Sequence, residues 1–154
     1  MVFIHYGTEK LNKNYKYDNS KDARQWSRSI NKPICCLWSS PIKTNFGWKN
    51  FVEEKSGLIH KSLESFVKFK LTKDARVLVI SKKTIKSVFK KYGYTYRFWK
   101  KFYWDKIEKD YDAVYVDITS LGQGRLSSLV DEYYLNSFDV DSLCVWNLEK
   151  VKVV

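Results

Sequence analysis

The sequence predicts a single α+β domain over residues 1–154, with about seven short strands and about three or four helices. Two observations predict this class. Short apolar runs of β-favouring composition recur along the chain, and segments with the spacing of amphipathic helices fall mainly between the early runs. Strands predominate later, a distribution typical of mixed or antiparallel sheets. The composition, 44% hydrophobic and 17% aromatic, argues against disorder and predicts a substantial core.

Runs rich in apolar, aromatic and β-branched residues predict strands at residues 2–6, 34–39, 65–71, 75–80, 111–117, 143–146 and 151–154. Gly7 breaks the first of them. The run at 34–39 is apolar almost throughout, as expected for a strand buried on both faces, and Pro41 ends it. A turn at 72–74 separates the third and fourth runs, so we expect these two strands to be neighbours.

Helical spacing occurs in three segments, at residues 22–30, 48–56 and 84–92. In the first, Trp26 and Ile30 lie four residues apart, with Ser20 as a candidate N-cap. Gly57 is expected to end the second. The third is the clearest, because its apolar residues recur on one helical face and Gly93 follows it.

The chain is strongly basic, with 28 Lys and Arg against 17 Asp and Glu and a net charge of +11. Such an excess favours acidic partners, here a host protein or a nucleic acid. The densest basic stretch, residues 82–101, is interleaved with aromatic residues, which either stack on bases or cover the core above a solvated face. The candidate docking residues are Lys83, Lys86, Lys90, Arg97 and Lys100.

Other classes of protein are disfavoured. The three cysteines include an adjacent pair, Cys35 and Cys36, which argues against a disulfide framework and for a reducing compartment. His5 and His60 are the only histidines and no Cys-x-x-Cys pair occurs, so we expect no metal site. No apolar stretch is long enough to span a membrane. We therefore expect a cytoplasmic protein with neither metal nor membrane partner.

Three short motifs combine residue types that suit one chemistry. Residues 5–8 (His-Tyr-Gly-Thr) end the first strand, and residues 37–41 (Leu-Trp-Ser-Ser-Pro) lead toward a helix that begins with Trp48. Residues 139–142 (Asp-Val-Asp-Ser) precede a late strand. A carboxylate stabilises the positive charge that develops on a sugar when its glycosidic bond breaks, and indole rings stack on planar aromatic groups.

In these motifs and their order the chain resembles the ADP-ribosyltransferase-like superfamily, in particular its histidine-containing branch and small phage-encoded members. The resemblance implies two small, mostly antiparallel sheets packed together with flanking helices. It implies NAD as co-substrate and transfer of ADP-ribose to a host macromolecule, in counter-defence or host takeover. It assigns catalytic roles to His5 and Asp141, with Asp139 as the alternative acid. The NAD-binding residues that it implies are His5, Tyr6, Gly7, Thr8, Trp38, Ser39, Ser40, Trp48 and Phe51.

Alternatives remain open at this level. His5 also suits a polar position at a sheet rim, the tryptophans suit a core, and the serines and aspartates suit turns. Asp112 and Asp117, which bracket a strand, are competing acids. The chain could instead be a non-enzymatic basic module that binds nucleic acid or an acidic host protein. A third possibility within the same superfamily is an NAD-dependent RNA 2′-phosphotransferase.

Overall fold

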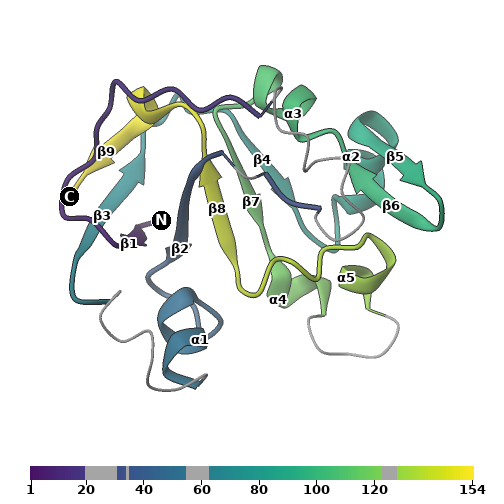
Figure 1. Ribbon diagram of the computed structural model, residues 1–154, viewed down its shortest axis with the longest axis horizontal. Coiled ribbons are helices and arrows are strands. Elements are labelled where there is room, and N and C mark those ends of the chain that lie inside the picture. The colour runs from purple at the N-terminus through teal and green to yellow at the C-terminus, as the bar shows by residue number, and fades with distance from the viewer. Residues whose placement is uncertain (20–30, 34, 55–62, 123–127) are drawn as a thin grey trace.

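The protein is described here from a computed structural model covering residues 1–19, 31–33, 35–54, 63–122 and 128–154 (Figure 1). It is a mixed α+β structure, as predicted. The strands are β1 Phe3–Tyr6, β2 Leu37–Pro41, β3 Phe66–Leu71, β4 Val77–Ile80, β5 Gly93–Tyr96, β6 Trp99–Phe102, β7 Ala113–Val116, β8 Ser142–Val145 and β9 Val151–Val153. The helices are α1 Trp48–Glu54, α2 Ile85–Tyr92, α3 Trp104–Asp110, α4 Ile118–Leu121 and α5 Leu129–Glu132, with a short 3-10 turn, η3, at Leu148–Lys150.

Each predicted strand has a counterpart in the structure, and two predicted helices correspond to α1 and α2. The helix predicted at 22–30 lies outside the described residues. The sequence did not predict the β5–β6 hairpin, nor α3, α4 and α5. The third and fourth predicted strands, β3 and β4, are not neighbours, because β3 pairs with β1 and β9 whereas β4 pairs with β7.

The strands form one curled seven-stranded sheet in the order β4-β7-β8-β2-β1-β3-β9, and β5 and β6 form a separate hairpin (Figure 1). All neighbours in the large sheet are antiparallel except β4 and β7. The expectation of two small sheets packed together was therefore wrong in this respect. The two halves are joined through β2, which pairs with β8 along its first residues and with β1 along its last.

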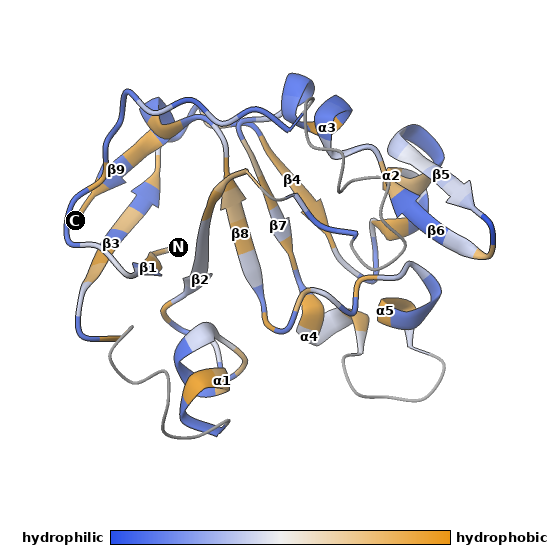
Figure 2. Cartoon of the chain, in the orientation of Figure 1, coloured by the Kyte–Doolittle hydropathy of each residue, from blue (hydrophilic) through white to orange (hydrophobic). Residues whose placement is uncertain are grey.

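The central strands contribute alternate residues to two apolar clusters on opposite faces of the sheet. On β7, Val114 and Val116 belong to the cluster beneath α2 and α3, whereas Ala113 belongs to the other. On β8, Cys144 belongs to the cluster beneath α2 and α3, and Leu143 belongs to the other cluster. This two-residue alternation follows from the pleat of a strand and explains why the central strands are apolar on both faces (Figure 2).

None of the helices in the described parts of the chain is long and apolar enough to cross a bilayer.

Candidate functional site

The site begins where β1 and β2 separate. The two strands pair at Phe3 with Pro41 and at Ile4 with Ser40, and their pairing ends there. Beyond this point, β2 continues to pair with β8 at Trp38, and β1 continues to pair with β3 at His5. β1 and β2 are therefore neighbours at one end only and diverge at the other (Figure 1).

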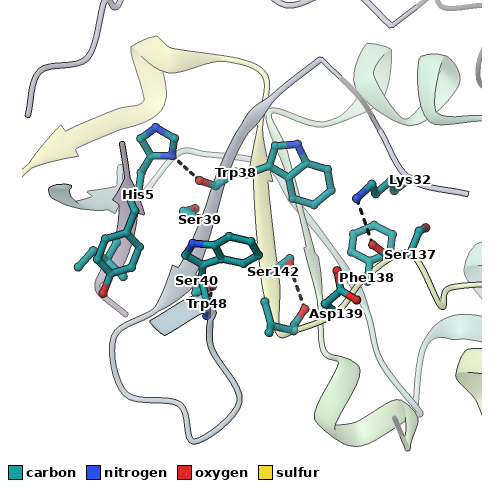
Figure 3. Close-up of a pocket in the computed structure, with 13 residues that line it drawn as sticks. His5, Lys32, Trp38, Ser39, Ser40, Trp48, Ser137, Phe138, Asp139 and Ser142 are labelled. Atoms are coloured by element: carbon teal, nitrogen blue, oxygen red, sulfur yellow. Dashed lines mark hydrogen bonds between the residues drawn. The ribbon is translucent and has the colours of Figure 1, made fainter. Parts of the chain in front are cut away.

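A cavity of about 370 Å³ lies at this opening. Its walls come from β1, β2, the start of α1 and the segment that leads into β8 (Figure 3). The lining residues named in Figure 3 are His5, Lys32, Trp38, Ser39, Ser40, Trp48, Ser137, Phe138, Asp139 and Ser142. A cavity of this size, with aromatic walls and a few polar groups, is typical of a small-molecule site.

His5 is held by the backbone of the strand from which β1 has separated. Its Nδ1 lies 2.6 Å from the carbonyl oxygen of Trp38. Because a carbonyl only accepts, Nδ1 carries the proton, and in the neutral imidazole Nε2 is then an acceptor. Nε2 makes no hydrogen bond within the described part of the chain. The ring thus takes the place of the missing strand pairing and keeps one nitrogen available for a ligand.

Two aromatic walls face the cavity. The ring of Trp38 packs against Phe138, with centroids 5.6 Å apart. At the start of α1, the ring of Trp48 stacks on Phe51 at 5.4 Å. Both indoles are partly exposed, so each keeps ring surface on which a planar ligand could stack.

Serine hydroxyls hold the strands and the helix in place around the cavity. Ser39 Oγ donates to the carbonyl of Leu143 on β8. Ser40 Oγ accepts from the backbone N–H of Trp48, which fixes the first turn of α1 against β2. The Ser40 hydroxyl donates no hydrogen bond to any of the described residues, so its proton can bond to a ligand.

Two side chains of opposite charge, Lys32 and Asp139, lie on the side of the cavity away from β1 (Figure 3). The ammonium of Lys32 donates to the carbonyl of Ser137 and lies 5.3 Å from the centre of the Trp38 ring. Asp139 is exposed and lines the cavity on the segment before β8 (Figure 3). Tyr6 also lines it, and burial together with the negative charge of Glu53 raises the pKa of its phenol, which stays neutral at neutral pH.

The structure brings together most of the predicted NAD-binding residues. His5, Tyr6, Trp38, Ser39, Ser40 and Trp48 all line the cavity. Gly7 does not; it ends β1 with φ +100°, and its N–H bonds to Ser65. Thr8 lines a second cavity of about 350 Å³, which His5 also borders. Phe51 supports Trp48 from behind instead of lining the cavity.

Asp141, the predicted catalytic acid, is buried and hydrogen-bonded. It is 4% exposed and does not line the cavity. Its carboxylate accepts from the hydroxyls of Thr44 and Thr119, each at 2.8 Å, and from the Thr119 N–H at 2.9 Å. These bonds connect the loop before α1 to α4. The alternative acid, Asp139, is the carboxylate that the structure places at the cavity.

The competing acids are also structural. Asp112 is buried and accepts from the N–H of Arg76 and the side chain of Asn147. Asp117 caps α4 by accepting from the N–H of Ser120. Neither lines the cavity.

Sequence reasoning missed several lining residues, including Lys32, Ser137, Phe138 and Ser142. Lys32, Ser137 and Phe138 come from segments that precede strands, whereas Ser142 is the first residue of β8 and the last residue of the 139–142 motif. Only nearness to Asp139 and Asp141 in the chain could have suggested the last three as lining residues. Nothing in the local sequence of Lys32 distinguishes it from the other lysines.

The predicted docking residues lie on α2 and the β5–β6 hairpin or beside them. Lys83, Lys86, Lys90 and Arg97 are exposed. Lys100 is engaged, since its ammonium lies 2.7 Å from Glu132 and over the ring of Tyr133. It is thus less available to a partner than the other four.

Within the described residues, no group of His, Cys, Asp and Glu side chains could hold a metal ion. Comparisons of the chain with protein-family models, with curated proteins and with solved structures gave no match.

Proposed function

We propose that the protein is an NAD-dependent mono-ADP-ribosyltransferase that modifies a macromolecule in the cytoplasm of a host cell. The observation that supports this best is the shared cavity. An imidazole from β1, an indole from β2 and a carboxylate from the segment before β8 line one space at the separation of two strands. These are the groups that the sequence motifs assign to NAD, with Asp139 in place of Asp141.

The residues present suit the nicotinamide and ribose end of NAD. Trp38 and Trp48 supply aromatic surface for a planar ring, and His5 supplies an acceptor for a ribose hydroxyl. The free hydroxyl proton of Ser40 can bond to an amide or sugar oxygen. Lys32 is the cation that lines the cavity and is the candidate for binding the negatively charged diphosphate.

Asp139 would stabilise the transition state. In the proposed reaction the bond between nicotinamide and ribose breaks, its electron pair leaves with the nicotinamide nitrogen, and the acceptor forms a bond to the sugar carbon and loses a proton. Positive charge develops on the ribose as this bond breaks. A fixed carboxylate is favourable there because its interaction with the sugar strengthens as the charge grows.

The test is to incubate the protein with labelled NAD and a host lysate, and to measure both nicotinamide release and label on macromolecules. We expect His5→Ala and Asp139→Asn each to lower both readouts by at least about tenfold, since transition-state contacts contribute one to several kcal/mol. Glu149→Gln is the matched control, because it removes an exposed carboxylate within η3 that does not line the cavity.

Two results would overturn the proposal. One is unchanged release in both site variants. The other is a folded wild-type protein that binds NAD, detected by ligand-observed NMR, but releases no nicotinamide with any lysate. The second result would favour the non-enzymatic alternative.

A further inference from the structure

The most one-sided charge in the described chain lies on α2 and the β5–β6 hairpin. Between residues 82 and 104 the sequence contains no Asp or Glu, while it contains Lys82, Lys83, Lys86, Lys90, Lys91, Arg97, Lys100 and Lys101. On α2, Lys86 and Lys90 lie one turn apart and are exposed. Like charges at this spacing repel and destabilise a helix. Neither lysine forms an ion pair within the described residues, so their charge is available to a partner.

The hairpin turn breaks the usual rules for such turns. Tyr96 pairs with Trp99, so Arg97 and Phe98 are the two turn residues. A two-residue turn with positive φ at its first position favours glycine there, yet Arg97 occupies it with φ 57°. Phe98 is 93% exposed, the highest value among the large hydrophobic side chains of the described chain. The ring of Phe98 gains almost no packing in this position, and such departures from the usual turn residues are expected at functional surfaces.

We propose that the hairpin tip and the exposed lysines of α2 form a docking surface for single-stranded nucleic acid. α2 leads directly into β5 and packs against both strands of the hairpin, so the two parts lie side by side (Figure 1). Phe98 offers a free ring face on which an unpaired base can stack. Arg97 precedes Phe98 in the turn, with its guanidinium 5.8 Å from the centre of the Tyr96 ring. Lys86 and Lys90 supply charges for the phosphates.

A single strand suits this surface better than a duplex or an acidic peptide. An exposed aromatic ring among basic groups matches a chain that carries both exposed bases and regularly spaced phosphates. In a duplex the bases are stacked on each other and unavailable to Phe98. An acidic peptide would use the lysines but leave the exposed ring without a planar partner. This inference is independent of the proposed NAD chemistry.

The docking surface is connected to the cavity through the chain around α5. The ring of Trp99 packs on Tyr134 at 5.2 Å, and Phe102 stacks on Tyr133 at 6.3 Å. The same segment continues to Phe138 and Asp139, which line the cavity. If both proposals hold, nucleic acid docked on the hairpin is the candidate acceptor.

The test is to titrate short, fluorescently labelled single-stranded RNA and DNA with the full chain. Fluorescence anisotropy, measured at several salt concentrations, gives the binding affinity. We expect Phe98→Ala and Phe98→Leu to weaken binding by about tenfold, while Phe98→Tyr keeps it, because stacking and not hydrophobicity is required. All three variants should fold normally, which circular dichroism checks, since the side chain is almost fully exposed.

The charge contribution has its own matched control. The logarithm of the association constant falls linearly with the logarithm of the salt concentration, and each phosphate contact on a single strand contributes about 0.7 to the steepness of that line. Replacing Lys86 and Lys90 by Ala should therefore make the line less steep by about 1.4. Replacing Lys70 and Lys152, an exposed pair on β3 and β9 at the other end of the molecule, removes the same charge and should leave the slope nearly unchanged.

Three results would overturn the inference, whatever the outcome with NAD. The first is equal binding by wild type and Phe98→Ala. The second is equal loss in the two double-lysine variants, which would indicate attraction by net charge alone. The third is Phe98-dependent binding to vesicles of anionic lipid or to an acidic peptide without such dependence for the oligonucleotides.

Discussion

Asp139 and Asp141 are two residues apart, and the structure predicts opposite consequences when each is replaced. Asp141→Ala should destabilise the fold, whereas Asp139→Asn should leave stability unchanged and lower nicotinamide release. The difference arises from surroundings: the Asp141 carboxylate is buried and accepts three hydrogen bonds from Thr44 and Thr119, while Asp139 is exposed at the cavity.

The magnitude follows from those bonds. A hydrogen bond to a charged group contributes about 1.5–3 kcal/mol to stability. The hydroxyls of Thr44 and Thr119 can turn toward water in the variant, because Thr119 is exposed and Thr44 is half-buried. The Thr119 N–H and the lost link between the loop before α1 and α4 account for most of the cost. We therefore expect a loss of about 3 kcal/mol, which for a chain of this length lowers the Tm by about 6–12 °C.

Thermal unfolding followed by circular dichroism measures the first effect, and chromatography of released nicotinamide measures the second. For Asp139→Asn we expect stability within about 0.5 kcal/mol of wild type, as for other exposed substitutions. A Tm for Asp141→Ala within about 2 °C of wild type would refute the structural role of this carboxylate. Full nicotinamide release by Asp139→Asn, with reduced release by a folded Asp141→Asn, would return the catalytic role to Asp141.

Two further predictions concern stability. Burial alone would raise the pKa of Asp112, but hydrogen bonds from the Arg76 N–H and the Asn147 side chain, with the charge of Arg76, hold it below its usual value. The stability that the Asp112 carboxylate contributes is present above the unfolded pKa of about 3.9 and is lost as the pH falls through the folded pKa. Asp112→Asn should therefore have a lower Tm than wild type at pH 7, and its Tm should decline less steeply as the pH is lowered. Parallel curves of Tm against pH for the two proteins would contradict this. Gly93→Ala would place a Cβ against the ring of Phe89 and 2.5 Å from the carbonyl oxygen of the same residue, closer than real Cβ atoms approach. We therefore expect urea unfolding to show a loss of about 1–3 kcal/mol in the free energy of unfolding, and an unchanged midpoint would show that α2 can shift to accommodate the methyl group.

The sequence predicted the strands well where they are largely buried on both faces, because β7 and most of β8 then consist of apolar and aromatic residues. It missed the β5–β6 hairpin for an equally physical reason. Hairpins are predicted from Asn-Gly or similar turn pairs, and here the turn is Arg97-Phe98. Helices α4 and α5 are four residues each, too short to show a helical period.

The choice between two acids was beyond local sequence. Asp139 and Asp141 both precede the same strand, and nothing near them shows which one is buried. The answer depends on Thr44 and Thr119, which lie 97 and 22 residues away from Asp141 in the chain. Contacts of this kind are set by the tertiary fold, and no pattern of spacing carries them.

The separation of β1 from β2 explains why a histidine is well suited to this position. A strand that loses its neighbour exposes a backbone carbonyl, and a buried carbonyl without a partner is costly. His5 donates to the Trp38 carbonyl from Nδ1 and so stabilises the open end of the sheet. Asn, Gln or Ser could also donate, but the rigid imidazole ring in addition holds a second polar atom at a fixed distance from the first. The side chain that links the two strands where they diverge therefore also holds a polar atom toward a ligand in the proposed site.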